Sequence, residues 1–346
     1  MNSILEQDLN NIVSHDIPWE YFNDKTVAIT GATGMLASYM VETLLYLNKT
    51  HNIKVRVLAL SRDVLRAKEQ YSHHEDNIYL QHVFADMNQP IHLDEKVDIM
   101  IHTASFASPK YYKSSPVHTI KPNVIGTSNL LDICVEKNVE KFLLFSSGEI
   151  YGEANTSESL LTEDNYGVID PLKPRSCYAV SKKMAETMCI AWAEQYGIDV
   201  KIVRPFHTYG PGMRLADGRV FSDFVSNIIN KENIVLKSDG MFSRPFCYIS
   251  DATKAFFAVL LKGETKHAYN VANPDQNIKI RDLANILVDV FSDRGISVEY
   301  SSHSDKDTFT SKTSEQLPSI SKLIKLGWEP MIDVREGFYR TVMSYE

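Results

Sequence analysis

Cysteine is scarce in this chain, and long apolar runs are missing. The four cysteines, Cys134, Cys177, Cys189 and Cys247, form no CxxC pair and have no histidine-rich neighbours, which predicts neither a disulfide framework nor a metal site. No apolar run approaches the roughly 20 residues of a membrane span. The opening MNSILEQDLNNIV is acidic and amphipathic, unlike a signal peptide. We therefore expect a cytoplasmic protein without a membrane partner.

Basic residues are also fewer than acidic ones. Lys and Arg number 36 against 44 Asp and Glu, giving a net charge of −8. This balance argues against nucleic acid as a partner. It does not exclude a small anionic ligand, because a local site can still be basic. With 346 residues and 44% hydrophobic content, the chain is long enough to bury a large core.

Apolar strand patterns alternate with helical ones over the first 206 residues. Helical patterns cover 124–138 and 178–197, and short strand-like runs occupy 26–30, 55–60, 78–86, 97–104, 141–147 and 199–206. Strands that are apolar throughout indicate a parallel sheet with helices on both faces. The predicted fold class is α/β, a doubly wound (Rossmann) parallel sheet with a smaller mixed α/β C-terminal lobe for the substrate.

The same patterns suggest a division of the chain. Residues 1–23 are predicted to form a helical leader, 24–206 the dinucleotide-binding domain and 207–346 mainly the substrate lobe. A later segment, about 245–262, is expected to return to the first domain. No internal repeat or low-complexity linker interrupts this order.

A glycine-containing loop, TGATGMLA (30–37), follows the first strand and opens a helix. Gly31 and Gly34 would allow a tight turn and a close approach of a pyrophosphate to the helix N-terminus. The small Ala37 would allow the helix to pack closely on the strand. A glycine pair after a strand can also be a plain turn, but its place at the first strand–helix turn of this fold favours dinucleotide binding.

The end of the second strand bears on the choice between NAD and NADP. LALSRD offers Ser61 and Arg62 before Asp63. An acidic residue there would bind the ribose of NAD, whereas an arginine accommodates the 2′-phosphate of NADP. The sequence thus favours NADP without excluding NAD, since Arg62 could equally be an ordinary exposed residue at the end of the strand. Asp86 and Met87, after the third strand, are candidates for the adenine side, although a capping Asp is equally ordinary.

Tyr178 and Lys182 stand four residues apart on a predicted helix and so share one face. A nearby ammonium favours tyrosinate and would lower the phenol's pKa, making Tyr178 a usable general base. Ser147, at the end of the fifth strand, would hydrogen-bond the hydroxyl that Tyr178 deprotonates.

Seven motifs in order carry a family resemblance: TGATGMLA, IHTASFASP, KPNVIGT, SSGEIYG, YAVSK, RPFHTYGPGMR and RPFCYISD. Together they resemble the extended short-chain dehydrogenase/reductases, in particular the NAD(P)-dependent nucleotide-sugar epimerase/dehydratase group. PRSCYAVSKK with DGRVFSDFV and RPFCYISD is most similar to UDP-glucuronate decarboxylases. The resemblance covers the chain from about residue 25 to 330.

The resemblance implies oxidation of a nucleoside diphosphate sugar at C4 to a 4-keto intermediate, in a homodimer formed through the helices that carry Asn123 and Tyr178. Glu149 would then serve as acid or base at a neighbouring carbon, leading to epimerisation, oxidation or decarboxylation. A variant 4,6-dehydratase, or an NADP-linked carbonyl reductase without a nucleotide on its substrate, is the alternative.

Site residues follow from the same resemblance. The catalytic group is Ser147, Glu149, Tyr178 and Lys182. The cofactor-binding group is Gly31, Thr33, Gly34, Met35, Leu36, Ser61, Arg62, Asp86, Met87, Thr103, Ala104, Ser105, Asn123, Ser146, Tyr178, Lys182 and Pro205. The substrate-binding group is Ser108, His207, Arg214, Arg219, Val220 and Arg244, of which Arg244 resembles the arginine that binds the diphosphate. Arg175 is a further candidate to meet a carboxylate or phosphate.

The chain departs from its relatives at three places. Gly148 stands where dehydratases have an acidic residue beside the Glu, so 4,6-dehydration by the usual route is not expected. Gln316 or Leu317 stands where decarboxylases have an arginine, which also puts simple decarboxylation in question. His207 replaces the usual asparagine that contacts the substrate.

Overall fold

A central parallel sheet organises the molecule, for which a computed structural model describes residues 2–152, 160–301 and 317–346. The strand order is β11-β7-β5-β4-β1-β2-β3, and every neighbouring pair is parallel. The strands are β1 (Thr26–Thr30), β2 (Arg56–Ser61), β3 (Leu80–Phe84), β4 (Ile99–His102), β5 (Lys141–Phe145), β7 (Asp199–Pro205) and β11 (His267–Val271). The chain order reverses between β1 and β4, and ligands of such sheets bind outside the carboxyl ends of the strands at this reversal.

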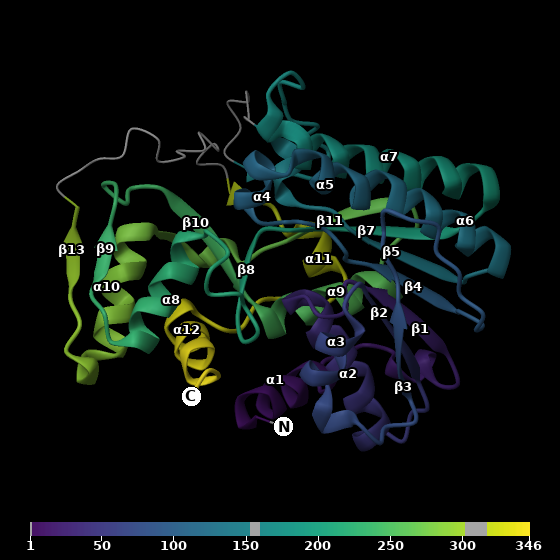
Figure 1. The fold of residues 1–346 in the computed structure, drawn as a ribbon, viewed down its shortest axis with the longest axis horizontal. Coiled ribbons are helices and arrows are strands. Elements are labelled where there is room, and N and C mark those ends of the chain that lie inside the picture. Colours follow the sequence, from purple (N-terminus) through teal and green to yellow (C-terminus); the bar gives the residue numbers. More distant parts are fainter. Residues whose placement is uncertain (1, 153–159, 302–316) are drawn as a thin grey trace.

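Helices cover both faces of the sheet (Figure 1). One face carries α1 (Ser3–Val13), α2 (Met35–Thr50), α3 (Val64–Gln70) and α9 (Ile249–Lys262). The other carries α4 (Pro109–Ser114), α5 (Pro116–Lys121), a π turn (Pro122–Gly126), α6 (Thr127–Lys137) and α7 (Cys177–Tyr196). The doubly wound α/β prediction is confirmed.

The uniform apolarity of the strands follows from this double cover. Along β1, Val27 and Ile29 pack into the core beneath α2 and α9, whereas Ala28 packs into the core beneath α6 and α7. Because successive side chains point to opposite faces, a strand with helices on both sides must be apolar at every position.

A smaller C-terminal lobe flanks the carboxyl edge of the sheet (Figure 1). Its three-stranded sheet is β12-β10-β8, and β13-β9 is a separate two-stranded sheet. A further pair, β14-β6, lies beside β11 of the main sheet, where Nδ2 of Asn270 donates to the carbonyls of Leu161 and Ser319. The strands are β6 (Leu160–Leu161), β8 (His207–Tyr209), β9 (Ile234–Leu236), β10 (Ser243–Tyr248), β12 (Asn277–Lys279), β13 (Val298–Tyr300) and β14 (Leu317–Pro318). The lobe's helices are α8 (Val220–Asn230), α10 (Ile280–Val290) and α12 (Val334–Met343), whereas α11 (Ser321–Lys325) packs on β11 and α9 of the main sheet domain.

One expectation about the elements needs correction. The sequence patterns placed six strands in the main sheet, but β11 adds a seventh on the outside of β7. The predicted N-terminal leader contains the helix α1, which packs on α2 and α9 and buries Leu9 and Ile12 completely. Within the part of the chain that the structure describes, no helix has the length and apolarity to cross a membrane.

Candidate active site

A single cavity of about 2080 Å³ opens at the carboxyl ends of the sheet strands and extends into the C-terminal lobe. With one exception, Asn123, every residue that the sequence proposed for the site lines it. The lining set from the sequence is Gly31, Thr33, Gly34, Met35, Leu36, Ser61, Arg62, Asp86, Met87, Thr103, Ala104, Ser105, Ser108, Ser146, Ser147, Glu149, Tyr178, Lys182, Pro205, His207, Arg214, Arg219, Val220 and Arg244. Residues from nine separate segments thus converge on one space.

The glycine loop has the shape that a dinucleotide requires. Gly31 has a φ of +64°, and a Cβ added there would lie 2.9 Å from Cα of Ala104. Gly34 is the N-cap of α2 and offers no side chain to its backbone N–H groups. These donors can therefore face a bound pyrophosphate, which the helix dipole also favours.

Five cavity residues carry buried side-chain atoms that have no hydrogen-bond partner among the described residues: Asn88 Oδ1, Ser105 Oγ, Ser146 Oγ, His207 Nδ1 and Thr208 Oγ1. Buried polar groups are almost always paired, so ligand atoms in the cavity are natural partners for them. Together with the glycine loop, they show that the residues present fit a nicotinamide dinucleotide with a second ligand beside it.

At the end of β2, one carboxylate oxygen of Asp63 is already engaged. Its carboxylate caps α3 by accepting the Arg66 backbone N–H at 2.9 Å, and its carbonyl accepts the Ser61 hydroxyl at 3.0 Å. The guanidinium of Arg62 lies 4.7 Å from the centre of the Phe106 ring, within cation–π range. Ser61, Arg62, Asp63 and Arg66 all line this end of the cavity.

The predicted catalytic residues come together at the ends of β5 and α7. Ser147 follows β5, and its hydroxyl accepts the Glu149 backbone N–H at 3.1 Å. Tyr178 is the second residue of α7, is buried and hydrogen-bonds to Ser147. Tyr112 stacks on the Tyr178 ring at 4.8 Å between centroids with 14° between planes. A ligand hydroxyl in the cavity can therefore hydrogen-bond to Ser147 and Tyr178 at the same time.

The expected effect of Lys182 on Tyr178 needs correction. Burial raises the pKa of Tyr178 to about 12, partly offset by the hydrogen bond from Ser147. Burial also lowers the pKa of Lys182 to about 7, and its Nζ donates to the Phe145 carbonyl at 2.6 Å. In the chain alone, desolvation thus outweighs the attraction between ammonium and phenolate that the sequence argument used.

Asn123 is the exception among the proposed cofactor residues. It is fully buried and does not line the cavity. Its Nδ2 donates to the Thr119 carbonyl at 3.1 Å and to the Ser181 hydroxyl at 2.9 Å. Ser181 in turn donates to the Tyr178 carbonyl at 2.9 Å. Asn123 therefore connects the π turn to α7 and positions the helix that carries Tyr178.

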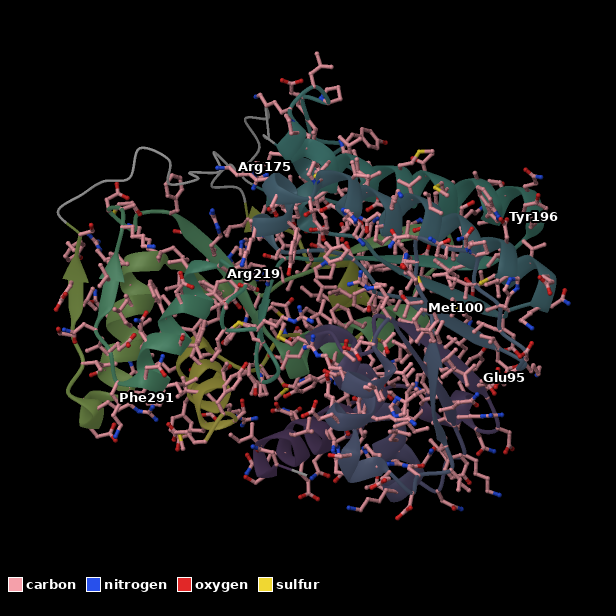
Figure 2. All side chains as sticks on the ribbon, viewed as in Figure 1. Glu95, Met100, Arg175, Tyr196, Arg219 and Phe291 are labelled. Atoms are coloured by element: carbon pink, nitrogen blue, oxygen red, sulfur yellow. The ribbon has the colours of Figure 1, made fainter. Side chains whose placement is uncertain are left out.

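Glu149 and Arg175 form an ion pair within the cavity. Nη1 of Arg175 lies 3.4 Å from Oε2 of Glu149, with both side chains about one-third exposed. Such a pair contributes little to stability, so both groups can exchange this contact for a ligand. Arg175 also lies 5.9 Å from the Tyr112 ring centre. Figure 2 marks Arg175 and Arg219 where the sheet domain and the C-terminal lobe meet.

Gly148 is packed against the ring of Phe206. A Cβ at position 148 would lie 2.8 Å from two ring carbons, a distance that real contacts do not reach. The ring also stacks on Tyr151 at 6.1 Å between centroids. Position 148, where dehydratases have an acid, therefore has no side chain and no space for one.

The lobe side of the cavity contributes His207 and a set of arginines. Burial, and then the charges of Arg244 and Arg219, lower the pKa of His207 to about 3, so its imidazole is neutral. Arg219 pairs with Asp217 at 3.2 Å, and Ser108 donates to the Asp217 carbonyl. A neutral imidazole beside two guanidinium groups can donate or accept a hydrogen bond next to an anion.

Sequence reasoning missed several lining residues, among them Tyr112, Phe106 and Phe206. Tyr112 had a signal, the SPKYYK segment after β4, but no spacing rule shows which tyrosine turns inward. Gln316 lies outside the described residues, and Leu317 pairs with Leu160 in β14-β6 without lining the cavity.

Comparisons with known proteins agree on the family. The NAD dependent epimerase/dehydratase family matches residues 27–272. UDP-glucuronic acid decarboxylase 2 of Arabidopsis thaliana is 33% identical over 320 residues, 92% of this chain and 68% of that protein.

Solved structures also resemble the fold. UDP-N-acetylglucosamine 4-epimerase from Methanobrevibacter ruminantium, in complex with UDP-N-acetylmuramic acid, has a TM-score of 0.77 and 25% identity, covering 93% of this chain and 98% of that one. UDP-glucuronic acid 4-epimerase from Bacillus cereus, with UDP-glucuronic acid and NAD, has a TM-score of 0.75 and 20% identity, covering 92% and 98%.

Proposed function

This chain belongs to the NAD dependent epimerase/dehydratase family, and we propose that it oxidises a nucleoside diphosphate sugar at C4 and then moves a proton at a neighbouring carbon through Glu149. The observation that carries the proposal is the continuity of the cavity, which joins the glycine loop, the Ser147–Tyr178 pair, Glu149 and Arg244. A cofactor and a sugar nucleotide can thus lie end to end with the reacting carbon beside Tyr178.

The first step uses Ser147 and Tyr178. Ser147 orients the C4 hydroxyl, and Oη of Tyr178 accepts its proton. The nicotinamide ring of the cofactor, when bound, takes the hydride from C4. Because Tyr178 alone is a neutral phenol at pH 7, it must lose its own proton first, and the amine of Lys182, with a pKa of about 7, lies one helical turn away.

The second step depends on Glu149. The 4-keto group makes the C5 proton acidic, and the Glu149 carboxylate can accept that proton while Arg175 holds its other side. Loss of the 6-hydroxyl needs a separate acid, and the contact of Gly148 with Phe206 leaves no room for one.

We infer that the sugar carries a carboxylate at C6. Arg175 pairs with Glu149 in the cavity, and guanidinium binds carboxylates in a bidentate manner. The named activities of the relatives, UDP-glucuronic acid decarboxylation and epimerisation, fit such a substrate. A 4-ketone that is β to a carboxylate would allow either release of CO₂ or exchange of the C5 proton.

For the cofactor, we propose NADP over NAD. The carboxylate of Asp63 is engaged at the N-terminus of α3, and Arg62 and Arg66 line that end of the cavity. Two guanidinium groups, beside a carboxylate that already caps α3, favour a 2′-phosphate. Related structures were solved with NAD bound, so both cofactors belong in the test.

We also propose a homodimer formed through α5 and α7. These helices pack on each other, and their outward positions Val117, Ile120, Val180 and Met184 are between 39% and 57% exposed. Apolar side chains gathered on neighbouring helices are typical of a protein interface.

The decisive experiment incubates the protein with UDP-, dTDP-, CDP- and GDP-linked sugars and uronic acids, with NAD or NADP, followed by mass spectrometry and NMR. We expect turnover of a sugar nucleotide with a C6 carboxylate. Glu149→Gln should lower formation of the final product by at least about 100-fold, the usual size of an acid–base contribution, while C4 oxidation, followed as reduced cofactor at 340 nm, continues.

Loss of water from a neutral hexose, or full product formation by Glu149→Gln, would contradict the proposal. Reduction of simple carbonyl compounds alone would favour the reductase alternative.

A further inference from the structure

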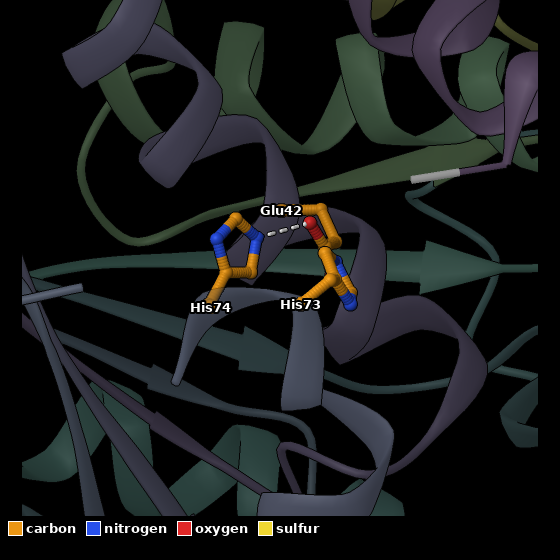
Figure 3. A group of neighbouring side chains, drawn as sticks. All are labelled: Glu42, His73 and His74. Carbon is orange, nitrogen blue, oxygen red and sulfur yellow. Dashed lines mark hydrogen bonds and ion pairs between the residues drawn. The ribbon is translucent and has the colours of Figure 1, made fainter. Parts of the chain in front are cut away.

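Outside the cavity, a carboxylate and two imidazoles meet between α2 and the loop before β3. Glu42 lies on α2, and His73 and His74 form a short 3₁₀ turn (Ser72–His74) after α3 (Figure 3). None of the three lines the active-site cavity. Neither the fold nor the chemistry proposed above accounts for the cluster.

The ligand atoms of these residues converge closely. One Glu42 oxygen lies 3.0 Å from Nε2 of His73, and the other lies 2.8 Å from Nε2 of His74. The two imidazole rings stand 4.3 Å apart between centroids. All three ligand atoms lie within 4.8 Å of one another, and Glu42 is almost fully buried, with a side-chain exposure of 6%.

A buried carboxylate between two imidazoles needs positive charge. Each Glu42 oxygen contacts one imidazole Nε2, and a metal ion held by all three groups can supply that charge. The spacing admits a metal, because tetrahedral Zn²⁺ with ligands at about 2.0–2.1 Å places them about 3.3 Å apart, a few tenths of an ångström more than the two carboxylate–imidazole distances and within the 4.8 Å that contains all three ligand atoms.

We propose that Glu42, His73 and His74 bind a Zn²⁺ ion. Two imidazole nitrogens favour zinc over Mg²⁺ or Ca²⁺, which prefer oxygen ligands. The His73 side chain is 29% exposed, so water can reach the ion and complete a four-coordinate site. No described histidine, cysteine, aspartate or glutamate other than these three joins such a group.

The ion would attach the loop before β3 to α2. The neighbouring Tyr71 is buried, and its hydroxyl donates at 2.6 Å to the carbonyl of Ala32, which belongs to the glycine loop. A zinc site here would therefore stabilise the segment that supports the glycine loop. Its role would be structural, not catalytic.

The test uses the full, untagged chain, stripped with chelator and titrated with Zn²⁺ by calorimetry, and Co²⁺ as a spectroscopic probe. We expect one Zn²⁺ per chain, a rise in the melting temperature with Zn²⁺, and the visible absorption bands of tetrahedral Co²⁺. His73→Ala/His74→Ala should weaken Zn²⁺ binding more than about tenfold, the least that altered metal surroundings usually cost. His92→Ala, which removes an exposed histidine elsewhere, is the matched control and should bind as wild type does.

Removal of both histidines leaves a buried carboxylate and can impair folding, so Glu42→Gln provides a second variant. It keeps the size and hydrogen-bonding capacity of the side chain and removes the anionic ligand, and its Zn²⁺ affinity should fall comparably. Equal Zn²⁺ binding by wild type and both variants, or no binding by wild type, would overturn the proposal. The latter result would leave a purely hydrogen-bonded cluster.

Discussion

Single side chains decide the chemistry at the floor of this cavity. Gly148 and Glu149 are neighbours in the chain, yet one is closed off by a phenyl ring and the other faces a guanidinium. The sequence showed that an acid is missing at position 148. The structure adds the physical reason that one could not simply be restored, since Phe206 fills the space.

Gly148→Asp should therefore fail to produce water loss from a sugar nucleotide. The new Cβ must displace the Phe206 ring, and overpacking of this kind costs about 1–3 kcal/mol of unfolding free energy. Denaturant unfolding and product mass spectrometry measure the two effects. Gly148→Ala should be destabilised to a similar degree, and the penalty should shrink when Phe206→Ala is combined with either change. A Gly148→Asp protein as stable as wild type would contradict the packing argument.

His207 should make the protein sensitive to acid. Burial lowers the pKa of His207 to about 3 in the folded chain, whereas an unfolded histidine titrates near 6.5. The unfolded state therefore binds more protons between these values, and stability falls as pH drops through that window, by up to about 1.4 kcal/mol per pH unit.

Urea unfolding at pH 7 and pH 5 tests this dependence. His207→Asn should lose less stability between the two pH values than wild type does. Some loss should remain, because burial also lowers the pKa of His102 to about 3. An unchanged difference between pH 7 and pH 5 would show that His207 does not titrate as described.

At the scale of elements, α7 has two roles. Its inner side places Tyr178 and Lys182 at the cavity, held from behind by Asn123 through Ser181. Its outer side exposes Val180 and Met184 beside α5. The sequence predicted both roles through the spacing of Tyr178 and Lys182 and through the family resemblance. It assigned Asn123 to the cofactor, because a motif does not show which way a buried amide points.

Met184→Glu should shift the protein toward monomers. A charge placed on an apolar interface must be desolvated without a partner, which disfavours association. Light scattering coupled to size-exclusion chromatography measures the change in mass. Leu65→Glu on α3, where the side chain is 81% exposed, is the control and should leave the mass unaltered. A wild-type monomer would exclude the proposed interface.

On the scale of the whole molecule, one buried carboxylate connects four distant parts of the chain. Asp8 of α1 accepts hydrogen bonds from Tyr39 of α2 at 2.9 Å, from Tyr248 of β10 at 2.7 Å and from Arg340 of α12 at 2.8 Å. The chain termini lie near each other beside this network (Figure 1). The sheet domain and the C-terminal lobe are therefore joined through the N-terminal helix.

Asp8→Ala should lower the unfolding free energy by about 3–5 kcal/mol, the usual effect of removing one partner from a buried ion pair. Arg340 and two tyrosine hydroxyls would lose their common acceptor. Glu6→Ala, an exposed change on the same helix, should stay within about 0.5 kcal/mol of wild type. Thermal and denaturant unfolding measure the stability of both variants. Equal stability of the two would show that the network contributes nothing.

The amino-acid sequence by itself determined the fold class and most of the site. Uniformly apolar strands require cover on both faces, and the glycine loop and the Tyr178–Lys182 spacing act through local geometry that neighbours in the chain define. Tertiary structure decided what depends on packing between distant segments. The protonation of Tyr178 and Lys182 follows from burial, the closure of position 148 follows from Phe206, and the Glu42–His73–His74 cluster exists only because α2 and a later loop meet. Desolvation and close contact are properties of the folded chain, and no local spacing encodes them.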